Sequence, residues 1–217
     1  MSKSVVYTAI FGNYDTLSDP QAISKDCDYI CFTDDYKLKS DVWGIRVIDL
    51  PIPNDYSRSN RYIKINPHEF LSEYEYSLYL DGNIVLKGIL EIAGVLDDCS
   101  IAIEEHPCRD CIYKEAIECK RLELGVASEI DRQIEDYRDI DFPEHAGLWA
   151  NWMIFRRHNE PDLIEREREW WEHIAKYSWR DQISFPVAFK EYPIRTLPPY
   201  CLLHSQTIEF KEHLQKV

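Results

Sequence analysis

The chain contains an apolar stretch from Tyr76 to Leu86 that is interrupted by only three residues, Asp81, Gly82 and Asn83. The five residues before the interruption are rich in tyrosine and leucine, which is typical of a buried strand rather than a helix. The glycine allows a sharp turn, so we expect Asp81 at the carboxyl end of this strand. Open α/β sheets bind their ligands at that edge. The alternative is a plain Asp-Gly turn that joins two strands.

Segments with strand and helix character alternate along the rest of the chain. Strands are expected at residues 5–10, 28–33, 43–50, 100–104, 151–156 and 194–197, and helices at 55–66, 89–96, 109–124, 128–139, 161–177 and 179–189. This alternation favours an α/β fold with a mostly parallel mixed sheet and helices on both faces. No segment resembles a linker, so we expect residues 1–217 to form a single domain.

The formal net charge of −14 argues against nucleic acid or an anionic membrane surface as a non-specific partner. No apolar run approaches the roughly 20 residues that a membrane-spanning helix needs, and the start of the chain does not read as a signal peptide. The seven cysteines are an odd number without small-scaffold spacing, which indicates reduced thiols and a cytoplasmic location. The sequence carries no signal for an oligomeric state.

A basic trio lies in the helix expected at residues 55–66. Arg58 and Arg61 are three residues apart and share a face, and Lys64 lies close to it. In so acidic a chain, a phosphorylated ligand requires a local reversal of the electrostatic field. Arginine suits a pyrophosphate because its planar fork matches the phosphate oxygens. The alternative is a solvated helix face.

The turn after the first strand is aromatic. We expect Thr8, Ala9 and Tyr14 to hold a nucleobase by stacking, with Asp34 accepting a hydrogen bond from a ring N–H or a ribose hydroxyl. The alternative is ordinary packing of these side chains in the core.

Two further groups are candidates for a ligand cleft. His106, Arg109 and Glu115 follow an expected strand end and begin a helix, where side chains often face a ligand; a buried polar network is the alternative. Asp181 and Gln182 open a later helix and are placed to touch a sugar's hydroxyls or its reacting carbon, unless Asp181 only caps the helix.

The metal candidates are Asp81, Asn83 and His204. A carboxylate and an imidazole suit Mn²⁺ or a related ion, whereas Mg²⁺ prefers oxygen ligands alone. The alternative for His204 is a structural or surface histidine. A zinc site built on the C-x-x-C spacing of Cys108 and Cys111 is disfavoured because the sequence has no second C-x-x-C.

Five motifs occur in one order over most of the chain. They are V-V-Y-T-A-I-F-G-N-Y-D at 5–15, R-x-x-R-x-x-K-x-x-P-H at 58–68, Y-S-L-Y-L-D-G at 76–82, H-x-x-R-x-x-x-x-x-E at 106–115 and S-W-R-D-Q-I-S-F at 178–185. With this ordered set the chain resembles the glycosyltransferase-like family of plant mucilage and turgor-regulation proteins and their bacterial relatives, formerly a domain of unknown function.

The resemblance implies a GT-A-type nucleotide-sugar transferase fold. More distantly, the chain looks like metal-dependent GT-A enzymes with an Asp-x-Asp motif, a late Asp-Gln pair and a C-terminal histidine. Asp81 then corresponds to a metal ligand and Asn83 takes the place of the second aspartate. Asp181 and Gln182 correspond to the late pair, and His204 to the histidine. The neutral Asn83 departs from that pattern and weakens the case for metal binding.

The function that follows is transfer of a sugar from a nucleoside diphosphate, with UDP expected, to a hydroxyl of a glycan or glycolipid acceptor, assisted by Mn²⁺ or Mg²⁺. The alternative is a catalytically inactive module that binds a sugar nucleotide or a glycan, as the neutral Asn83 and the short chain suggest. A hydrolase that uses His106 with Asp110 or Glu115 is disfavoured because the chain has no Gly-x-Ser-x-Gly motif.

Overall fold

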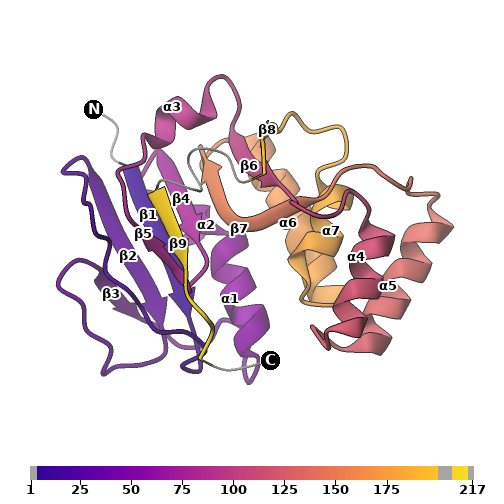
Figure 1. Cartoon of the computed structure of the whole chain (residues 1–217), viewed down its shortest axis with the longest axis horizontal. Coiled ribbons are helices and arrows are strands. Elements are labelled where there is room, and N and C mark those ends of the chain that lie inside the picture. The colour runs from indigo at the N-terminus through magenta and orange to yellow at the C-terminus, as the bar shows by residue number, and fades with distance from the viewer. Residues whose placement is uncertain (1–3, 200–206, 215–217) are drawn as a thin grey trace.

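The computed structural model describes residues 4–199 and 207–214, which are built around one twisted mixed sheet (Figure 1). The strand order is β3-β2-β1-β4-β7-β6-β8. Neighbouring strands are parallel except beside β7, which runs antiparallel to both β4 and β6. The strands are β1 (Ser4–Ile10), β2 (Cys27–Thr33), β3 (Gly44–Val47), β4 (Tyr76–Leu80), β6 (Ile101–Glu105), β7 (Trp149–Arg156) and β8 (Arg195–Leu197).

Alternating side chains of each strand bury the two faces of this sheet in different cores. On β1, Tyr7 and Ala9 belong to the first core and Val6 and Ile10 to the second, as the two-residue period of a strand requires. Helices α1 (Tyr56–Ile65), α2 (Pro67–Phe70), α6 (Pro161–Lys176) and α7 (Asp181–Ala188) border the first core. The second is covered by α3 (Ile92–Leu96) and a small antiparallel sheet of β5 (Ile84–Leu86) and β9 (Ile208–Phe210).

A third apolar cluster joins α7 to α4 (Ile112–Arg121) and α5 (Ala127–Asp139), which lie side by side at the right of Figure 1. Cys119 is buried in this cluster, so it acts as a small apolar side chain, as expected of a free cysteine on the core face of a helix. No helix within the described ranges is both long and apolar enough to cross a bilayer.

The predicted fold class is confirmed: this is an α/β fold with a mostly parallel mixed sheet and helices on both faces. The predicted elements are present, although the third strand and several helices are shorter than expected. Sequence reasoning missed three short elements, α2, β5 and β9. Each of these three elements has only three or four residues and so carries little periodicity.

Asp81 directly follows β4 at the carboxyl edge of the sheet, as predicted. The backbone N–H of Ile84 donates to the carbonyl of Asp81 over 3.0 Å, which closes a turn. This turn does join two strands, but β4 and β5 belong to different sheets, so it is not a hairpin. Gly82 is needed for space: a Cβ atom there would lie 2.9 Å from Oδ2 of Asp15 and from Cγ1 of Ile10.

Candidate functional site

The main pocket, with a volume of about 540 Å³, opens at the carboxyl ends of β1 and β4. Its walls come from the turn after β1, from α1, from the turn after β4, from the first half of β7 and from residues 179–182 at the start of α7. Because β7 is antiparallel to its neighbours, it begins at the edge where the other strands end. The pocket therefore occupies the ligand-binding edge that is general for open α/β sheets.

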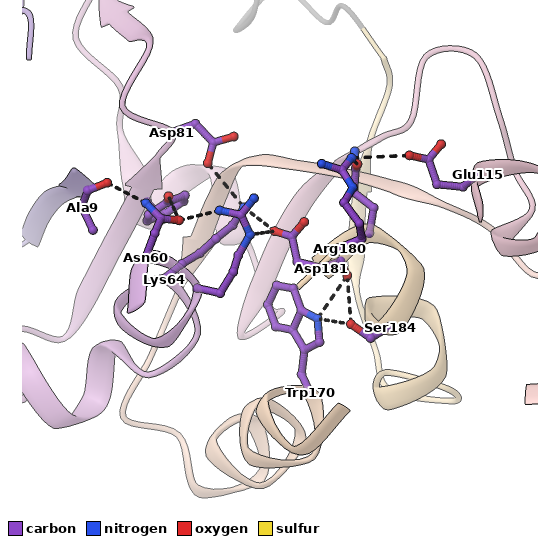
Figure 2. A network of polar contacts seen from close by, with 12 residues as sticks. Ala9, Asn60, Lys64, Asp81, Glu115, Trp170, Arg180, Asp181 and Ser184 are labelled. Atoms are coloured by element: carbon purple, nitrogen blue, oxygen red, sulfur yellow. Dashed lines mark hydrogen bonds and ion pairs between the residues drawn. The ribbon is translucent and has the colours of Figure 1, made fainter. Parts of the chain in front are cut away.

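Two cations from α1 meet two carboxylates at the floor of this pocket (Figure 2). The Nζ atom of Lys64 lies 2.5 Å from Oδ2 of Asp181 and 3.4 Å from Oδ1 of Asp81. The Nε atom of Arg61 lies 3.4 Å from the same oxygen of Asp181. Lys64 is buried, whereas the side chain of Asp81 keeps 31% of its surface exposed and faces the cavity. Arg61 and Lys64 are thus brought together as the spacing on α1 predicted.

The charges of this cluster support one another. Burial alone would raise the pKa of Asp181, but Arg61, Lys64 and Arg180 together lower it to about 2. Burial lowers the pKa of Lys64, and the nearby carboxylates of Asp181 and Asp81 oppose that shift. Asp181 is consequently an anion at neutral pH, with its charge already neutralised by the surrounding cations.

Asp181 is the first residue of α7, and the N-cap position before it is occupied by Arg180. The alternative of simple helix capping is therefore wrong. The start of α7 is fixed by Trp170, whose Nε1–H lies 3.2 Å from the carbonyl oxygen of Asp181 and 3.1 Å from Oγ of Ser184. Gln182 also lines the pocket, and its Oε1 atom accepts a hydrogen bond of 2.8 Å from Arg180.

Arg58, in contrast, does not line the pocket. Its guanidinium donates to the carbonyl oxygens of Ile174 and Tyr177 over 3.1 and 2.6 Å and forms ion pairs with Asp55 and Glu129. The prediction that it binds a pyrophosphate is not supported, because these contacts tie the guanidinium to the start of α1 and to the neighbouring helices α5 and α6.

Of the four residues predicted to hold the nucleoside around the aromatic turn, two line the pocket and two do not. Ala9 and Tyr14 line the pocket, but Thr8 is buried within β1 and does not. Asp34 lies outside the lining and its Oδ1 atom accepts a 3.0 Å hydrogen bond from the backbone N–H of Gly12. Asp34 therefore shapes the turn, and the prediction that it contacts the nucleotide directly is not supported. Gly12, with φ of +62°, packs under the ring of Tyr56.

Of the three residues predicted to bind a metal, the two that the structure describes, Asp81 and Asn83, do not line the same cavity. Asp81 faces the pocket, but Asn83 lies outside its lining and donates a 3.0 Å hydrogen bond to the carbonyl of Lys211. His204 lies outside the described residues. In residues 4–199 and 207–214, no group of three His, Cys, Asp or Glu side chains is placed to hold an ion. The described donors therefore do not fit a complete metal centre, and Asp81 already has the ammonium of Lys64 beside it.

His106 and Arg109 line a second, smaller cavity of about 290 Å³. The predicted cluster exists: Glu115 is buried beneath it and accepts a 2.5 Å hydrogen bond from Nε of Arg109, with His106 Nε2 at 3.9 Å. The other carboxylate oxygen of Glu115 lies 3.7 Å from Arg180, which lines the main pocket. The two alternatives for these residues are thus both present: His106 and Arg109 line a cavity, and Glu115 joins them in a buried polar network.

Sequence reasoning missed Asn151 and His213. Asn151 lines the main pocket, is buried, has a φ of +35° and, within the described part of the chain, finds no hydrogen-bond partner for either side-chain amide atom. It lies in an irregular part of β7, where residues 150–153 face the single residue Glu104 of β6. Bulges beside a binding site commonly redirect a side chain. The only sequence signal was one polar residue within an apolar strand.

His213 closes the other side of the pocket. Its Nδ1 atom lies 2.6 Å from Oδ1 of Asp15, and its ring lies 4.9 Å from that of Tyr14. The hydrogen bond to Asp15 raises the pKa of His213. This contact brings the segment after β9 onto the turn after β1, and no local sequence pattern predicts it.

Comparison with known proteins identifies the family. The model of the TOD1/MUCI70 glycosyltransferase-like domain matches residues 1–200. The chain belongs to this family. The resemblance inferred from the five motifs is thereby confirmed.

One relative of this TOD1/MUCI70 domain is the Arabidopsis thaliana protein named probable hexosyltransferase MUCI70. The two are 25% identical over 222 residues, which cover 88% of this chain and 38% of the relative. Among solved structures, the apo structure of the bifunctional glycosyltransferase WbbM has a TM-score of 0.54 and 13% identity, and the match covers 90% of this chain and 39% of that one. The domain thus spans less than half the length of either protein, and the structural match supports the fold alone.

Proposed function

We propose that this TOD1/MUCI70 domain transfers a sugar from a nucleoside diphosphate donor, with UDP the expected nucleotide, to a hydroxyl group of a glycan or glycolipid. Membership of a glycosyltransferase-like family supports the reaction class. The main observation behind the proposal is that Lys64 and Arg61 lie together at the floor of a pocket, where both contact Asp181. This pocket lies at the carboxyl edge of the sheet. Cations fixed there before the donor arrives are suited to a diphosphate.

In the proposed reaction, an oxygen of the acceptor hydroxyl forms a bond to the anomeric carbon of the donor sugar. The bond from that carbon to the diphosphate breaks, and its electron pair leaves with the diphosphate. The hydroxyl proton passes to the released diphosphate or to solvent. Lys64 and Arg61 stabilise the negative charge that grows on the leaving diphosphate. This contact accelerates the reaction only to the extent that the two cations bind the diphosphate more tightly in the transition state than in the bound donor.

Asp181 is better suited to hold these cations than to accept the hydroxyl proton. A general base works best when its pKa lies near the working pH, and the pKa of Asp181 is lowered to about 2 by Arg61, Lys64 and Arg180 against the effect of burial. Gln182, which also lines the pocket, is proposed to contact the donor sugar. Tyr14 is proposed to stack on the base.

Assistance by Mn²⁺ or Mg²⁺ stays a prediction, with Asp81 as the described residue that would bind the ion. The described side chains do not complete such a site, so no step above depends on it. Release of UDP from UDP-sugars with added Mn²⁺, with added Mg²⁺ and with EDTA measures the requirement directly. The cytoplasmic location likewise stays a prediction.

A thermal-shift panel of nucleoside diphosphates and their sugars, followed by an assay of UDP release, tests the proposal. A ligand that binds only the folded state raises the melting temperature. Arg61→Ala and Lys64→Met should abolish the shift with UDP and slow UDP release about 100-fold, as removal of one oxyanion-stabilising group does in other enzymes. Lys190→Ala, a change at an exposed position away from the pocket, is the matched control.

Two results would decide against a transferase. Binding of UDP-sugars without any turnover, with or without metal, would favour the alternative of an inactive sugar-nucleotide-binding module. If none of the nucleotides tested binds, both the transferase and the binding-module interpretations of the pocket are wrong.

A further inference from the structure

We propose that the second cavity, at the carboxyl end of β6, binds the terminal sugar of the acceptor, and that this sugar is a neutral hexose. The cavity has a volume of about 290 Å³, which is the size of a small ligand site. This assignment rests on the proposed function, because it takes the main pocket as the donor site.

The two cavities are adjacent along β7 and the residues before it. Leu148 and Trp149 line the second cavity, and Ala150 and Asn151, the next residues, line the main pocket. Consecutive Cα atoms are about 3.8 Å apart. A hydroxyl that projects from a sugar in the second cavity towards Ala150 is therefore directed at the donor.

A chain of charged side chains, centred on buried Glu115, connects the same two cavities on the side of α4. Glu115 lies 2.5 Å from Arg109 of the second cavity and 3.7 Å from Arg180 of the main pocket. Figure 2 shows the second of these contacts, with Arg180 between Glu115 and the cluster around Asp181. Glu115 thus fixes one basic side chain in each wall, so the positions of the two sites are coupled.

Contacts within the chain hold the walls of the second cavity in place. Gly147, with φ of +95°, packs against the indole of Trp149, where a Cβ atom would lie 2.9 Å from Cη2. The indole N–H donates to Oγ1 of Thr196 over 3.2 Å. Nδ1 of His145 lies 2.7 Å from Oδ2 of Asp110, which ties the loop before β7 to the segment before α4. A preformed site reduces the entropy lost when a ligand binds.

The wall chemistry favours a neutral sugar. Trp149 offers a flat apolar surface for the C–H face of a sugar ring, and the carboxylates of Glu105 and Asp110 accept hydrogen bonds from hydroxyl groups. The single lining arginine, Arg109, is balanced by buried Glu115. The wall therefore has a net negative charge, which repels uronic acids and phosphorylated sugars.

Saturation-transfer NMR with methyl glycosides of glucose, galactose, mannose and glucuronic acid tests the assignment. At least one neutral glycoside should give a signal, and the glucuronide should give none. Glu105→Gln should weaken the binding of that glycoside at least fivefold and raise its KM as acceptor by the same factor. Trp149→Ala should abolish the signal, and Trp149→Phe, which keeps an aromatic ring, should restore part of it.

Glu165→Gln is the matched control, since Glu165 is an exposed carboxylate that lines a different surface hollow. A melting-temperature shift with UDP reports that each variant is folded and still binds the donor. Equal glycoside binding by wild type, Glu105→Gln and Trp149→Ala, or preference for the glucuronide, would overturn the acceptor assignment and leave the proposed function intact. Failure of the wild type to bind any nucleotide would instead contradict the proposed function.

Discussion

At the scale of single residues, the pocket is made by side chains that the sequence separates widely. Lys64 and Asp181 are 117 positions apart and meet at 2.5 Å. The sequence marked each as a candidate, but nothing in it showed that the two form a pair. Asn151 carried even less signal, because one amide in an apolar strand looks like any other tolerated polar residue.

Asn151 provides the first prediction. Its φ of +35° is a backbone conformation that side chains rarely adopt, and its amide has no hydrogen-bond partner among the described residues to lose. Asn151→Gly should therefore be about 1 kcal/mol more stable than Asn151→Ala, since only glycine is free of strain at positive φ. Both variants should slow transfer about 10-fold if the amide contacts the donor sugar. Denaturant unfolding and steady-state kinetics measure the two effects.

Equal stability of these two variants would show that the backbone at residue 151 is not strained. Unchanged kinetics in both would show that the amide does not touch the substrate.

Asp181 provides a prediction of pH dependence. The pKa of this carboxyl is lowered to about 2 in the folded protein, because Arg61, Lys64 and Arg180 outweigh burial, whereas in an unfolded chain it is about 3.9. A carboxyl whose pKa is lower in the folded than in the unfolded protein stabilises the fold at any pH above its unfolded-state pKa. This stabilisation is lost as the pH falls towards the folded-state pKa. The contribution is about 2 kcal/mol.

The measurement is the free energy of unfolding of wild type and Asp181→Asn between pH 6 and pH 2. The difference between them should shrink by about 2 kcal/mol as the pH falls. Asp131→Asn, a change at a largely exposed carboxylate, is the control. A difference that stays constant over this range would show that the pKa of Asp181 is not depressed.

At the scale of elements, Arg58 joins three helices. From α1 it reaches the carbonyl oxygens of Ile174 and Tyr177 at the end of α6 and the carboxylate of Glu129 on α5. These partners are far away in sequence, so spacing alone predicts that the basic trio forms one phosphate-binding face. The structure separates Arg58 from Arg61 because the former points to other helices and the latter into the pocket.

Arg58→Ala should consequently lower stability rather than donor affinity. Its removal leaves two carbonyl oxygens without their donor, and we expect a loss of about 2 kcal/mol in the free energy of unfolding. Calorimetry and UDP titration separate the two effects, and Arg168→Ala, at an exposed position on α6, serves as the comparison. A normal melting temperature together with weak UDP binding would restore Arg58 to the donor site.

The elements themselves were largely predictable. β1, β2, β4 and β7 are apolar runs bounded by turn residues, and α6 combines a proline at its start with an apolar face, so local pattern alone identifies them. The irregularity of β7 and the pairing of β5 with β9 were not predictable, because both depend on residues that become neighbours only in the folded sheet. The irregular part of β7 contributes Asn151 to the pocket, and the segment after β9 contributes His213.

At the scale of the whole molecule, a strongly acidic chain is proposed to bind an anionic donor. The formal net charge is −14, while the floor of the pocket pairs two cations with two carboxylates. The charges at the floor of the pocket therefore nearly cancel when seen from a distance. We expect the net negative charge of the whole chain to repel an approaching nucleotide. The cations act only at contact, where their hydrogen bonds and close charges outweigh the field of the surface.

This balance predicts an unusual salt dependence for the association of UDP. A ligand that is attracted to its site by long-range charge binds more slowly as salt is added. Here, added salt instead screens a repulsion between UDP and the acidic protein. The screening acts over distances beyond the Debye length, which is about 10 Å at 0.1 M salt. The association rate measured by stopped-flow fluorescence should rise between 20 and 200 mM NaCl, and the dissociation rate should rise as the contacts with Lys64 and Arg61 weaken. Neutral uridine is the control, since its association rate should not change. An association rate for UDP that falls with salt would show that an attractive field extends beyond the pocket.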